Sequence, residues 1–485
     1  MKFQSVLHNT ILISIASIVT QIVSLVLIPI IGRNASVEDF GIFNAILADI
    51  SLISIFLCLG LQQVVIVAKS KNMAILVYKL ALLSSSIILI LLFIFMIIFN
   101  QAHLKYFSEF FEYRYLIFIL IAIEGIFIPT QILNLKLGNY IIISKSRILK
   151  TVISKGVLLF FLLLLGSSVY FFIYSEILAG IIISYLLFRV ISKELSNINI
   201  SLKKIRFIYS KYFSFSFSIM ASDFLYRFNQ VFLIFLITTY YGLGVLGNFS
   251  MATLLAAVPT TLLTSALSEV LFRELSFEKN SDVISNKAIN LLQIIMIVAL
   301  CIFVNIYFYG AKIAGLILGP KWIHVGPILK ITVISSFSNF VFTPFISIFK
   351  LLNFQKYIVL FFISIIIFSN LAFYVGTNHD DYILSFLWNG IVSLMLSFIF
   401  LFVLFYKLKS NNMKILLDLA YMFLSALPLV ILGFVYEYLA FENSFFMLLF
   451  IIIGSIAMFV INYLYLPYFR LITKVIHTNL FFFSK

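Results

Sequence analysis

The sequence has few charged residues, few cysteines and few of the residues that break helices. Asp, Glu, Lys and Arg make up 11% of its 485 residues, whereas soluble domains carry about 25%. Its mean hydropathy is +1.17. The shortage of charge excludes a water-soluble globular protein, and the 63% of hydrophobic residues excludes a disordered chain. Glycine and proline number only 19 and 8, which excludes collagen-like and linker-like chains.

Cysteine and histidine are also scarce. The two cysteines, Cys58 and Cys301, both lie in apolar stretches, so the sequence offers neither a disulfide framework nor a thiolate metal site. The five histidines lie in or near predicted loops, with no two at the spacing of metal ligands. No glycine-rich phosphate loop or G-x-S-x-G motif is present. We therefore expect no cofactor, no bound metal and no catalytic residue.

What the sequence contains in abundance is long apolar runs bounded by charged or turn-forming residues. A transmembrane helix needs about 20 such residues. The runs lack the polar–apolar alternation of barrel strands. We therefore predict an all-α polytopic membrane protein with about 14 transmembrane helices. The predicted spans are 10–31, 41–68, 74–99, 115–135, 152–168, 170–191, 213–238, 248–271, 288–310, 330–352, 357–376, 382–405, 415–435 and 444–466.

The basic residues of the loops define an orientation for these spans. With the N-terminus inside, the inside segments hold 26 of the 33 Lys and Arg residues and the outside segments hold six; the last, Arg227, lies within a span. This bias agrees with the positive-inside rule and places both termini inside. Because the basic residues are spread over many short loops, the net charge of +15 predicts no nucleic-acid partner.

Two segments 206 residues apart resemble each other. Residues 31–44 and 237–250 align without a gap, and each ends one span and opens the next. Six spans precede residue 200, and spans seven to twelve repeat their up-down order; both sets start inside, so we predict a parallel repeat about an axis along the membrane normal. The predicted regions are an N-terminal six-helix lobe (1–200), a C-terminal six-helix lobe (201–410), and two additional transmembrane helices with a cytoplasmic tail (411–485).

The first helix of each predicted lobe carries a polar stripe. Asp223, Arg227 and Gln230 stand at i, i+4 and i+7, which is one helix face. The same offset of 206 places three polar residues on one face of the first span: Ser17, Gln21 and Ser24. Such stripes either line a cavity or join neighbouring helices. Asp223 is either the structural partner of Arg227, or Arg227 offers its guanidinium to a phosphate group.

Three carboxyl groups within the spans are candidates for proton or sodium coupling: Glu124, Asp49 and Glu176. An acidic residue at the centre of a transmembrane helix costs about 2.5–3.5 kcal/mol, so each of them suggests function or pairing. Glu124 is the strongest candidate because Pro129, five residues later, frees a backbone carbonyl and can kink the helix. The alternative is a buried carboxyl that is satisfied by neighbouring groups.

Three short motifs follow one another on this topology. They are Arg33-x5-Asp39-Phe40-Gly41-Ile42-Phe43; Leu225-Tyr226-Arg227-Phe228-Asn229-Gln230 with Gly244-x2-Gly247-x-Phe249-Ser250-x-Ala252; and Leu318-Gly319-Pro320-Lys321-Trp322-x4-Pro327-Ile328-Leu329. By these motifs the chain resembles the polysaccharide transporter family of the multidrug/oligosaccharidyl-lipid/polysaccharide flippase superfamily. The resemblance covers the chain to about residue 410. Asn229 departs from that family, which often has Asp there.

The resemblance implies two six-helix lobes around a cavity that opens alternately to each side of the bacterial plasma (inner) membrane. It implies a flippase, not an enzyme, for an undecaprenyl-diphosphate-linked oligosaccharide such as an O-antigen or capsule repeat unit. The implied partners are this lipid-linked substrate, the lipid bilayer and other polysaccharide-assembly membrane proteins. Two extra spans beyond the common twelve also occur in lipid II flippases, so the lipid-linked sugar stays open.

On this hypothesis the head group binds to a set of polar residues: Arg227, Asp223, Gln230, Gln21 and Arg33. Arg33 would act at the outer mouth, where it can form a gating ion pair with Glu38 or Asp39. One alternative is an ion-coupled drug or small-solute antiporter of the same superfamily, with an anionic pocket. Another is a membrane glycosyltransferase or polymerase that uses Glu38 and Asp39, although the large outer loop typical of such enzymes is missing.

Overall fold

The computed structural model describes residues 2–98, 110–195, 201–276, 281–352, 354–379, 381–410, 412–439 and 444–465. Every regular element in these ranges is helical, and 13 helices are long and apolar enough to cross a membrane. One of them, α9 (Leu202–Ser276), holds both the seventh and the eighth predicted span. These spans are separated at Gly242, whose φ of 81° and ψ of −179° are not helical. The predicted all-α fold with fourteen spans is therefore confirmed.

The chain packs as two compact units, which are described separately. Unit 1 comprises Met1–Ser250 and Leu318–Lys321, and unit 2 comprises Met251–Ile317 and Trp322–Lys485. The division falls within α9, so the first part of this long helix packs with the elements that precede it. The lobe limits predicted at residues 200 and 410 remain a prediction.

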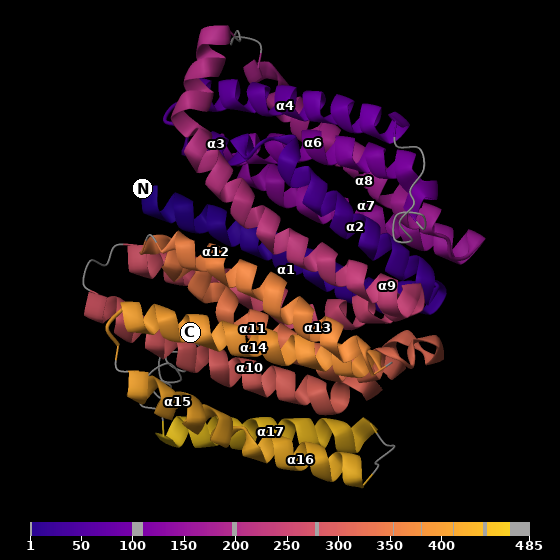
Figure 1. Ribbon diagram of the computed structural model, residues 1–485, viewed down its shortest axis with the longest axis vertical. Helices are drawn as coiled ribbons and strands as arrows, with labels where there is room; N and C mark the ends of the chain where they lie inside the picture. Colours follow the sequence, from indigo (N-terminus) through magenta and orange to yellow (C-terminus); the bar gives the residue numbers. More distant parts are fainter. Residues whose placement is uncertain are drawn as a thin grey trace, which may run out of the picture. The chain divides into compact units, whose positions relative to one another are not determined.

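Unit 1 is a helical bundle (Figure 1). Its helices before α9 are α1 (Lys2–Asn34), α2 (Val37–Leu57), α3 (Leu61–Val67), α4 (Lys71–Ile98), α6 (Arg114–Lys136), α7 (Tyr140–Leu165) and α8 (Val169–Leu195). Helix α7 packs against α1 and α8, and α6 packs against α4 and α8. Small residues permit this approach, because a Cβ at Gly125 would lie 2.3 Å from Ser85 Oγ and one at Gly180 would lie 2.7 Å from Ile123 Cγ2.

Two glycines that the sequence repeat aligns, Gly41 on α2 and Gly247 on α9, lie against each other. A Cβ at Gly41 would lie 2.8 Å from the backbone nitrogen of Gly247. A Cβ at Gly247 would lie 1.9 Å from the carbonyl oxygen of Val37. Equivalent residues of a two-fold repeat meet only beside its axis, so this contact agrees with the parallel repeat and explains why both positions are glycine.

Unit 2 contains the second part of α9 and the remaining helices. They are α10 (Ser281–Leu318), α11 (Val325–Leu351), α12 (Gln355–Ser364), the π-helical η3 (Ile365–Ser369), α13 (Asn370–Thr377), α14 (Tyr382–Lys407), α15 (Asn412–Ser425), α16 (Leu427–Tyr438) and α17 (Ser444–Tyr465). Helix α14 packs against α11 and α13. The two additional spans comprise α15 to α17, and they join α10 through a contact between the rings of Phe308 and Phe434, 5.0 Å apart.

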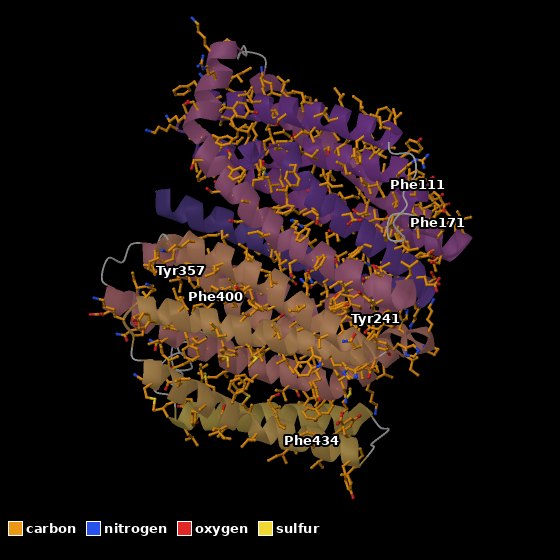
Figure 2. All side chains as sticks on the ribbon, in the orientation of Figure 1. Phe111, Phe171, Tyr241, Tyr357, Phe400 and Phe434 are labelled. Carbon is orange, nitrogen blue, oxygen red and sulfur yellow. The ribbon has the colours of Figure 1, made fainter. Side chains whose placement is uncertain are left out.

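The chain has 56 phenylalanine residues, and their rings make many of the contacts within each unit (Figure 2). In unit 2, the ring of Phe361 lies 4.0 Å from that of Phe342 and 5.3 Å from that of Phe400. In unit 1, the rings of Phe161 and Phe171 stack with their centroids 5.0 Å apart. Lipid tails are as apolar as these side chains, so close packing, and not water exclusion, is what such contacts contribute inside a membrane.

Candidate functional site: a polar line along α7

One helix of unit 1, α7, carries a line of polar side chains that reach three neighbouring helices. Arg147, Lys150 and Ser154 stand at i, i+3 and i+7, which places them on one face. The helix begins at Tyr140, twelve residues before the predicted start of the fifth span at 152. Arg147 and Lys150 are therefore helical residues of a membrane-capable segment rather than residues of a loop before it, and their predicted place on the inside of the membrane remains a prediction.

The central contact of this line is an ion pair between α7 and α6. Lys150 Nζ lies 3.2 Å from Glu124 Oε1, and the two side chains are 26% and 27% exposed. The same ammonium lies 4.3 Å from the centroid of the Phe127 ring, a cation–π contact. Glu124, the strongest carboxyl candidate from the sequence, is thus held by a cation that is itself only partly solvated.

The line continues on both sides of this pair. Toward α1, Arg147 Nη1 donates to the hydroxyl of Ser17 at 3.3 Å, so one member of the predicted α1 stripe contacts the line. Toward α8, the hydroxyl of Ser154 donates to the carboxylate of Glu176. The structure therefore places two of the three predicted coupling carboxyls, and Ser17 of the α1 stripe, against α7.

The other polar residues of this face of α1 do not form a site with a second helix in the described contacts. Ser24 Oγ donates to the Thr20 carbonyl at 3.0 Å, and Thr20 Oγ1 donates to the Ala16 carbonyl at 2.5 Å. Both bonds run within the helix and use the proton that each hydroxyl could otherwise donate to an anionic ligand. Gln21, one turn beyond Ser17, is half-buried. Asp49, the third coupling candidate, is half-buried on α2.

The α9 stripe lies on the first part of α9, within unit 1. Arg227 is half-buried, whereas Asp223 and Gln230 are exposed. No ion pair joins Arg227 to Asp223 in the part of the chain that the structure describes. Gln230 Nε2 instead donates to the hydroxyl of Tyr226 at 3.2 Å. The geometry therefore favours a guanidinium that is not neutralised by the carboxylate four residues before it.

An aromatic ladder follows the same stretch of α9. The rings of Phe224 and Phe228 stack at 5.5 Å, and those of Phe228 and Phe232 stack at 5.7 Å. Phe224 also contacts Phe56 of α2, with centroids 5.5 Å apart. The ladder fixes this part of α9 on α2 and gives the half-buried Arg227 apolar neighbours along its own helix.

The end of unit 1 that is predicted to face outward holds the predicted gate residues. Arg33 is exposed in the last turn of α1, and its Cγ lies 4.0 Å from a Cβ built at Gly319. Asp39 accepts a hydrogen bond from the hydroxyl of Ser167. Ser36 caps α2 by accepting from the Asp39 N–H at 3.1 Å, and its own N–H donates to Ser167 Oγ at 2.8 Å. The described partner of Asp39 is therefore the turn between α7 and α8, and the predicted gating pair with Arg33 is not among the contacts that the structure describes.

The side chains that could bind a metal ion are dispersed over the described part of the chain. No three His, Cys, Asp or Glu side chains in those ranges lie close enough together to hold an ion. The charged contacts of the α7 line are a carboxylate with an ammonium, a carboxylate with a hydroxyl, and a guanidinium with a hydroxyl. Such an arrangement can bind a proton, exchange its counter-ion for another anion, or shift between two pairings.

Sequence reasoning missed Lys150 and Arg147 as site residues. Both were assigned to an inside loop because a cluster of basic residues precedes the most apolar part of the fifth span. The signal that identifies them is their spacing: Arg147, Lys150 and Ser154 recur at helical intervals and alternate with apolar residues on the other faces.

The fold of the chain is that of multi-pass membrane transporters. It is similar to the lipid II flippase MurJ in an inward closed conformation, with a TM-score of 0.70 at 15% identity over 94% of this chain and 98% of that one. A transporter of the MOP superfamily from Pyrococcus furiosus is similar at a TM-score of 0.59, with 16% identity and coverage of 83% and 96%. An inward-facing multidrug resistance MATE family transporter is similar at 0.56, with 15% identity and coverage of 81% and 98%.

The sequence itself defines the family. The model of the polysaccharide biosynthesis protein family matches residues 30–327, which is more than half of the chain. The chain therefore belongs to this family and is a multi-pass membrane protein, and the resemblance drawn from its motifs is confirmed. No curated protein matches the sequence.

Proposed function

We propose that the chain is a flippase that moves an undecaprenyl-diphosphate-linked oligosaccharide repeat unit from the inner to the outer leaflet of the bacterial plasma membrane by alternating access. It performs no covalent chemistry on this substrate. Membership of the polysaccharide biosynthesis protein family supports the substrate class, and the similarity to the lipid II flippase supports the transport mode. The observation that carries the proposal is the half-buried Lys150–Glu124 pair in the middle of unit 1.

The substrate sets a physical problem that this pair can solve. Its lipid tail can stay in hydrocarbon, but its diphosphate is anionic and needs cations along the path. An unpaired ammonium inside a membrane protein is costly, so a cation that waits for a substrate must have a counter-ion meanwhile. Glu124 is that counter-ion at 3.2 Å, and the diphosphate replaces it at Lys150 during transport.

Arg227 is the second cation of the proposed path. It is half-buried and is not ion-paired with Asp223 in the described residues. Its planar guanidinium suits two phosphate oxygens at once. Gln230, Asp223 and Gln21 would contact the sugar or the remaining phosphate oxygens, and Arg33 would meet the head group at the outer mouth.

The membrane potential gives the transport its direction. Moving one elementary charge through it is worth about 2.3 kcal/mol per 100 mV, and a negative-inside cell drives an anionic head group outward. Glu124, Glu176 and Asp49 are the groups that would couple transport to protons or sodium. Protonation of Glu124 would release Lys150 for the substrate, so proton coupling needs no residue beyond this pair.

The function is tested by deleting the gene for this chain, expressing variants in its place, and measuring polysaccharide on the cell surface. Replacing Lys150 by Gln should abolish surface polysaccharide and leave lipid-linked repeat units on the cytoplasmic leaflet, because the path loses its central cation; Lys150→Arg should retain part of the export. Lys71→Gln is the matched control, since Lys71 pairs with Glu194 at 2.7 Å but is 51% exposed at the end of unit 1. Protein level is measured in the same cells.

Arg227 gives the test a second arm. Arg227→Ala should lose export at normal protein level, and Arg227→Lys should keep part of it. Full export by both Lys150→Gln and Arg227→Ala would contradict the proposal. If, instead, deletion of the chain leaves lipid-linked intermediates correctly exposed but makes the cells sensitive to cationic drugs, the antiporter alternative holds. Failure to extend the sugar chain after normal flipping would indicate the transferase alternative.

A further inference from the structure

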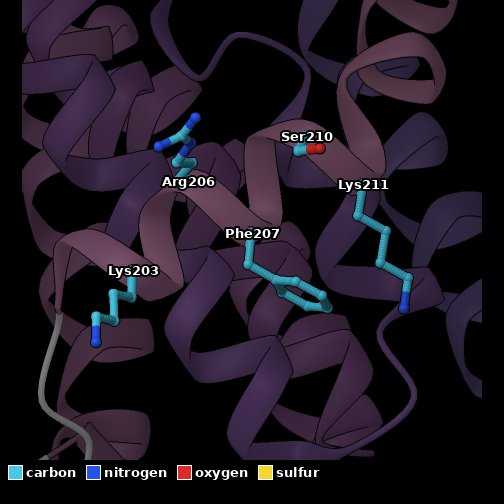
Figure 3. Close-up of a pocket in the computed structure, with 5 residues that line it drawn as sticks. All are labelled: Lys203, Arg206, Phe207, Ser210 and Lys211. Atoms are coloured by element: carbon cyan, nitrogen blue, oxygen red, sulfur yellow. The ribbon is translucent and has the colours of Figure 1, made fainter.

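The first turns of α9, at the end of unit 1 predicted to face the cytoplasm, carry a strongly basic face (Figure 3). Five residues at helical spacing line a hollow of about 520 Å³ on this face: Lys203, Arg206, Phe207, Ser210 and Lys211. All five side chains are exposed. We call these five residues the α9 basic face.

The opposite side of the same turns is packed, which fixes the direction of the basic face. Ile208 and Ser216 are buried, and they lie beside Leu59 and Leu61 of the α2–α3 region in a small apolar hollow. Gly60 approaches so closely that a Cβ there would lie 2.5 Å from the Ser216 carbonyl oxygen. The helix cannot rotate about its axis without breaking these contacts, so the basic face stays directed away from α3.

The basic face is not neutralised by acidic residues on its own helix. From residue 201 the next acidic residue along the chain is Asp223, and the residues between are apolar, aromatic, hydroxylic or basic. Lys211 lies instead over the rings of Phe207 and Tyr212, at 5.3 and 5.4 Å from their centroids. Cation–π contacts leave the ammonium charged and still able to meet an anion.

The sequence beyond the basic face places it at a membrane boundary. Two exposed rings, Phe213 and Phe217, stack at 5.9 Å directly after Lys211, and the helix then continues through the apolar seventh span. Basic side chains followed by exposed aromatic rings are typical of a helix that crosses the head-group layer. The hollow is thus expected at the depth of lipid phosphates.

We propose that the α9 basic face binds the phosphate head groups of anionic phospholipids in the cytoplasmic leaflet. Three cations and a hydroxyl on one face match phosphate oxygens, and the neighbouring Phe213 and Phe217 match acyl chains. The cytoplasmic leaflet attracts such clusters through its anionic lipids. This site goes beyond the proposed transport path, because it needs neither the sugar nor the diphosphate of the substrate.

Lipid bound here holds the start of the helix that carries Arg227. Helix α9 is continuous from Leu202 to the break at Gly242, so an anchor at its first turns sets the height of Arg227 in the membrane. Anionic lipid would therefore stabilise unit 1 independently of substrate. A soluble phosphate cannot replace it, because it has no chains for the aromatic rings and is not concentrated at the surface.

The test uses the purified full-length protein in neutral detergent micelles, with phosphatidylglycerol or phosphatidylcholine added and bound lipid counted by native mass spectrometry. The variant combines Lys203→Gln, Arg206→Gln and Lys211→Gln. Its apparent affinity for phosphatidylglycerol should fall at least tenfold, while retention of phosphatidylcholine stays unchanged. The matched control combines Lys350→Gln, Lys356→Gln and Lys407→Gln, three exposed residues of unit 2 predicted on the same side of the membrane.

Several outcomes would overturn the proposal. Wild-type affinity in the triple variant, or an equal loss in the control, would place the lipid elsewhere. Binding of inorganic diphosphate that competes with phosphatidylglycerol and is lost in the variant would make the site one for soluble phosphate. If the triple variant elutes as aggregate, the single variants Arg206→Gln and Lys211→Gln replace it, each with a loss of at least threefold. Substrate export does not enter the measurement, so failure here leaves the proposed function untouched.

Discussion

The polar faces of α7 in unit 1 and α14 in unit 2 differ in kind. Helix α7 presents charge: Lys150 pairs with Glu124 of α6, and Ser154 donates to the Glu176 carboxylate of α8. Both carboxylates lie well inside their helices, since Glu124 is the eleventh of the 23 residues of α6. The charged groups of unit 1 thus reach the middle of the bundle.

At its described hydrogen bonds to α11 and η3, helix α14 presents neutral groups. Ser397 shares a hydrogen bond of 2.7 Å with Ser338 of α11, and Ser393 shares one of 2.8 Å with Ser369 of η3. Asn389 Nδ2 donates to the Ser369 carbonyl at 3.1 Å. The described ion pair of unit 2, Lys330 with Glu437, joins α11 and α16 near their predicted outer ends.

This difference separates contacts that only hold helices together from contacts that suggest a function. Hydroxyl and amide contacts are sufficient to join membrane helices, as α14 demonstrates, and they contribute little more than about 1 kcal/mol each. Charge in the same place costs several times more, so its presence in unit 1 requires a further reason. We take the α7 line as the part of the molecule that handles an anion, and α14 as packing.

The largest effect is expected from adding a methyl group at a glycine where two helices touch. In unit 1 such a glycine faces backbone, whereas in unit 2 it faces a side chain. In unit 1, a Cβ at Gly247 would lie 1.9 Å from the Val37 carbonyl oxygen, which is backbone and cannot turn aside. Gly247→Ala should cost about 3 kcal/mol or more and remove most folded protein, measured as the monodisperse fraction on size-exclusion chromatography. In unit 2, Gly433→Ala meets the Phe308 ring at 2.4 Å, which can shift, so a smaller loss is expected.

Gly244→Ala is the control for this pair, because no atom lies within 4 Å of its Cβ position. Alanine is also favoured over glycine in a helix, by up to about 1 kcal/mol, so this variant should be neutral or stabilised. Normal yield of Gly247→Ala would mean that α2 and α9 do not approach as closely as the structure has them. The contact between the two repeats would then lose its physical basis.

Much of this architecture could be predicted from the sequence. The fourteen spans follow from runs of apolar residues, and these runs are unambiguous because hydrocarbon admits no exposed backbone polar groups. Even Gly41 and Gly247 could be found, through the 206-residue repeat, although nothing in the repeat indicates that they touch. Element type and order are local properties, which is why they were accessible.

The partners of the charged residues could not be predicted from the sequence in the same way. Glu124 was identified as costly and in need of a partner, yet its partner, Lys150, stands 26 residues away on another helix. The basic residues at the start of α7 satisfy the positive-inside rule and also form a helix face, and sequence alone cannot separate the two. Asp223 and Arg227 show the reverse case: helical spacing allowed an ion pair, and none joins them among the described residues.

The next largest effect is expected on the free energy of unfolding when the Lys150–Glu124 pair of unit 1 is broken. Lys150→Leu leaves the Glu124 carboxylate unpaired and should cost about 2 kcal/mol, below the roughly 3–5 kcal/mol of a fully buried pair because both groups are about a quarter exposed. The same change at the exposed Lys71 should cost well under 1 kcal/mol. Thermal unfolding of the purified variants measures both.

The double variant Lys150→Leu, Glu124→Leu separates stability from transport. With both charges removed, the unfolding temperature should return to within a few degrees of wild type, while export stays lost because the path lacks its cation. Recovery of export together with stability would make the pair purely structural. The contrast between α7 and α14 would then be one of composition only.

The smallest effect is expected at the neutral face of α14. Ser338→Ala removes the hydroxyl contact with Ser397 and a bond of 3.1 Å to the Ser393 carbonyl, and should cost about 1 kcal/mol because small hydroxyl contacts contribute no more than this. Ser86→Ala is the control, since that hydroxyl is exposed and bonds only within its own helix, to the Leu82 carbonyl. Both variants should export polysaccharide at the wild-type rate, measured beside the unfolding temperature. Loss of export by Ser338→Ala at normal protein level would show that neutral contacts of unit 2 take part in transport, and the assignment of anion handling to the α7 line alone would have to be abandoned.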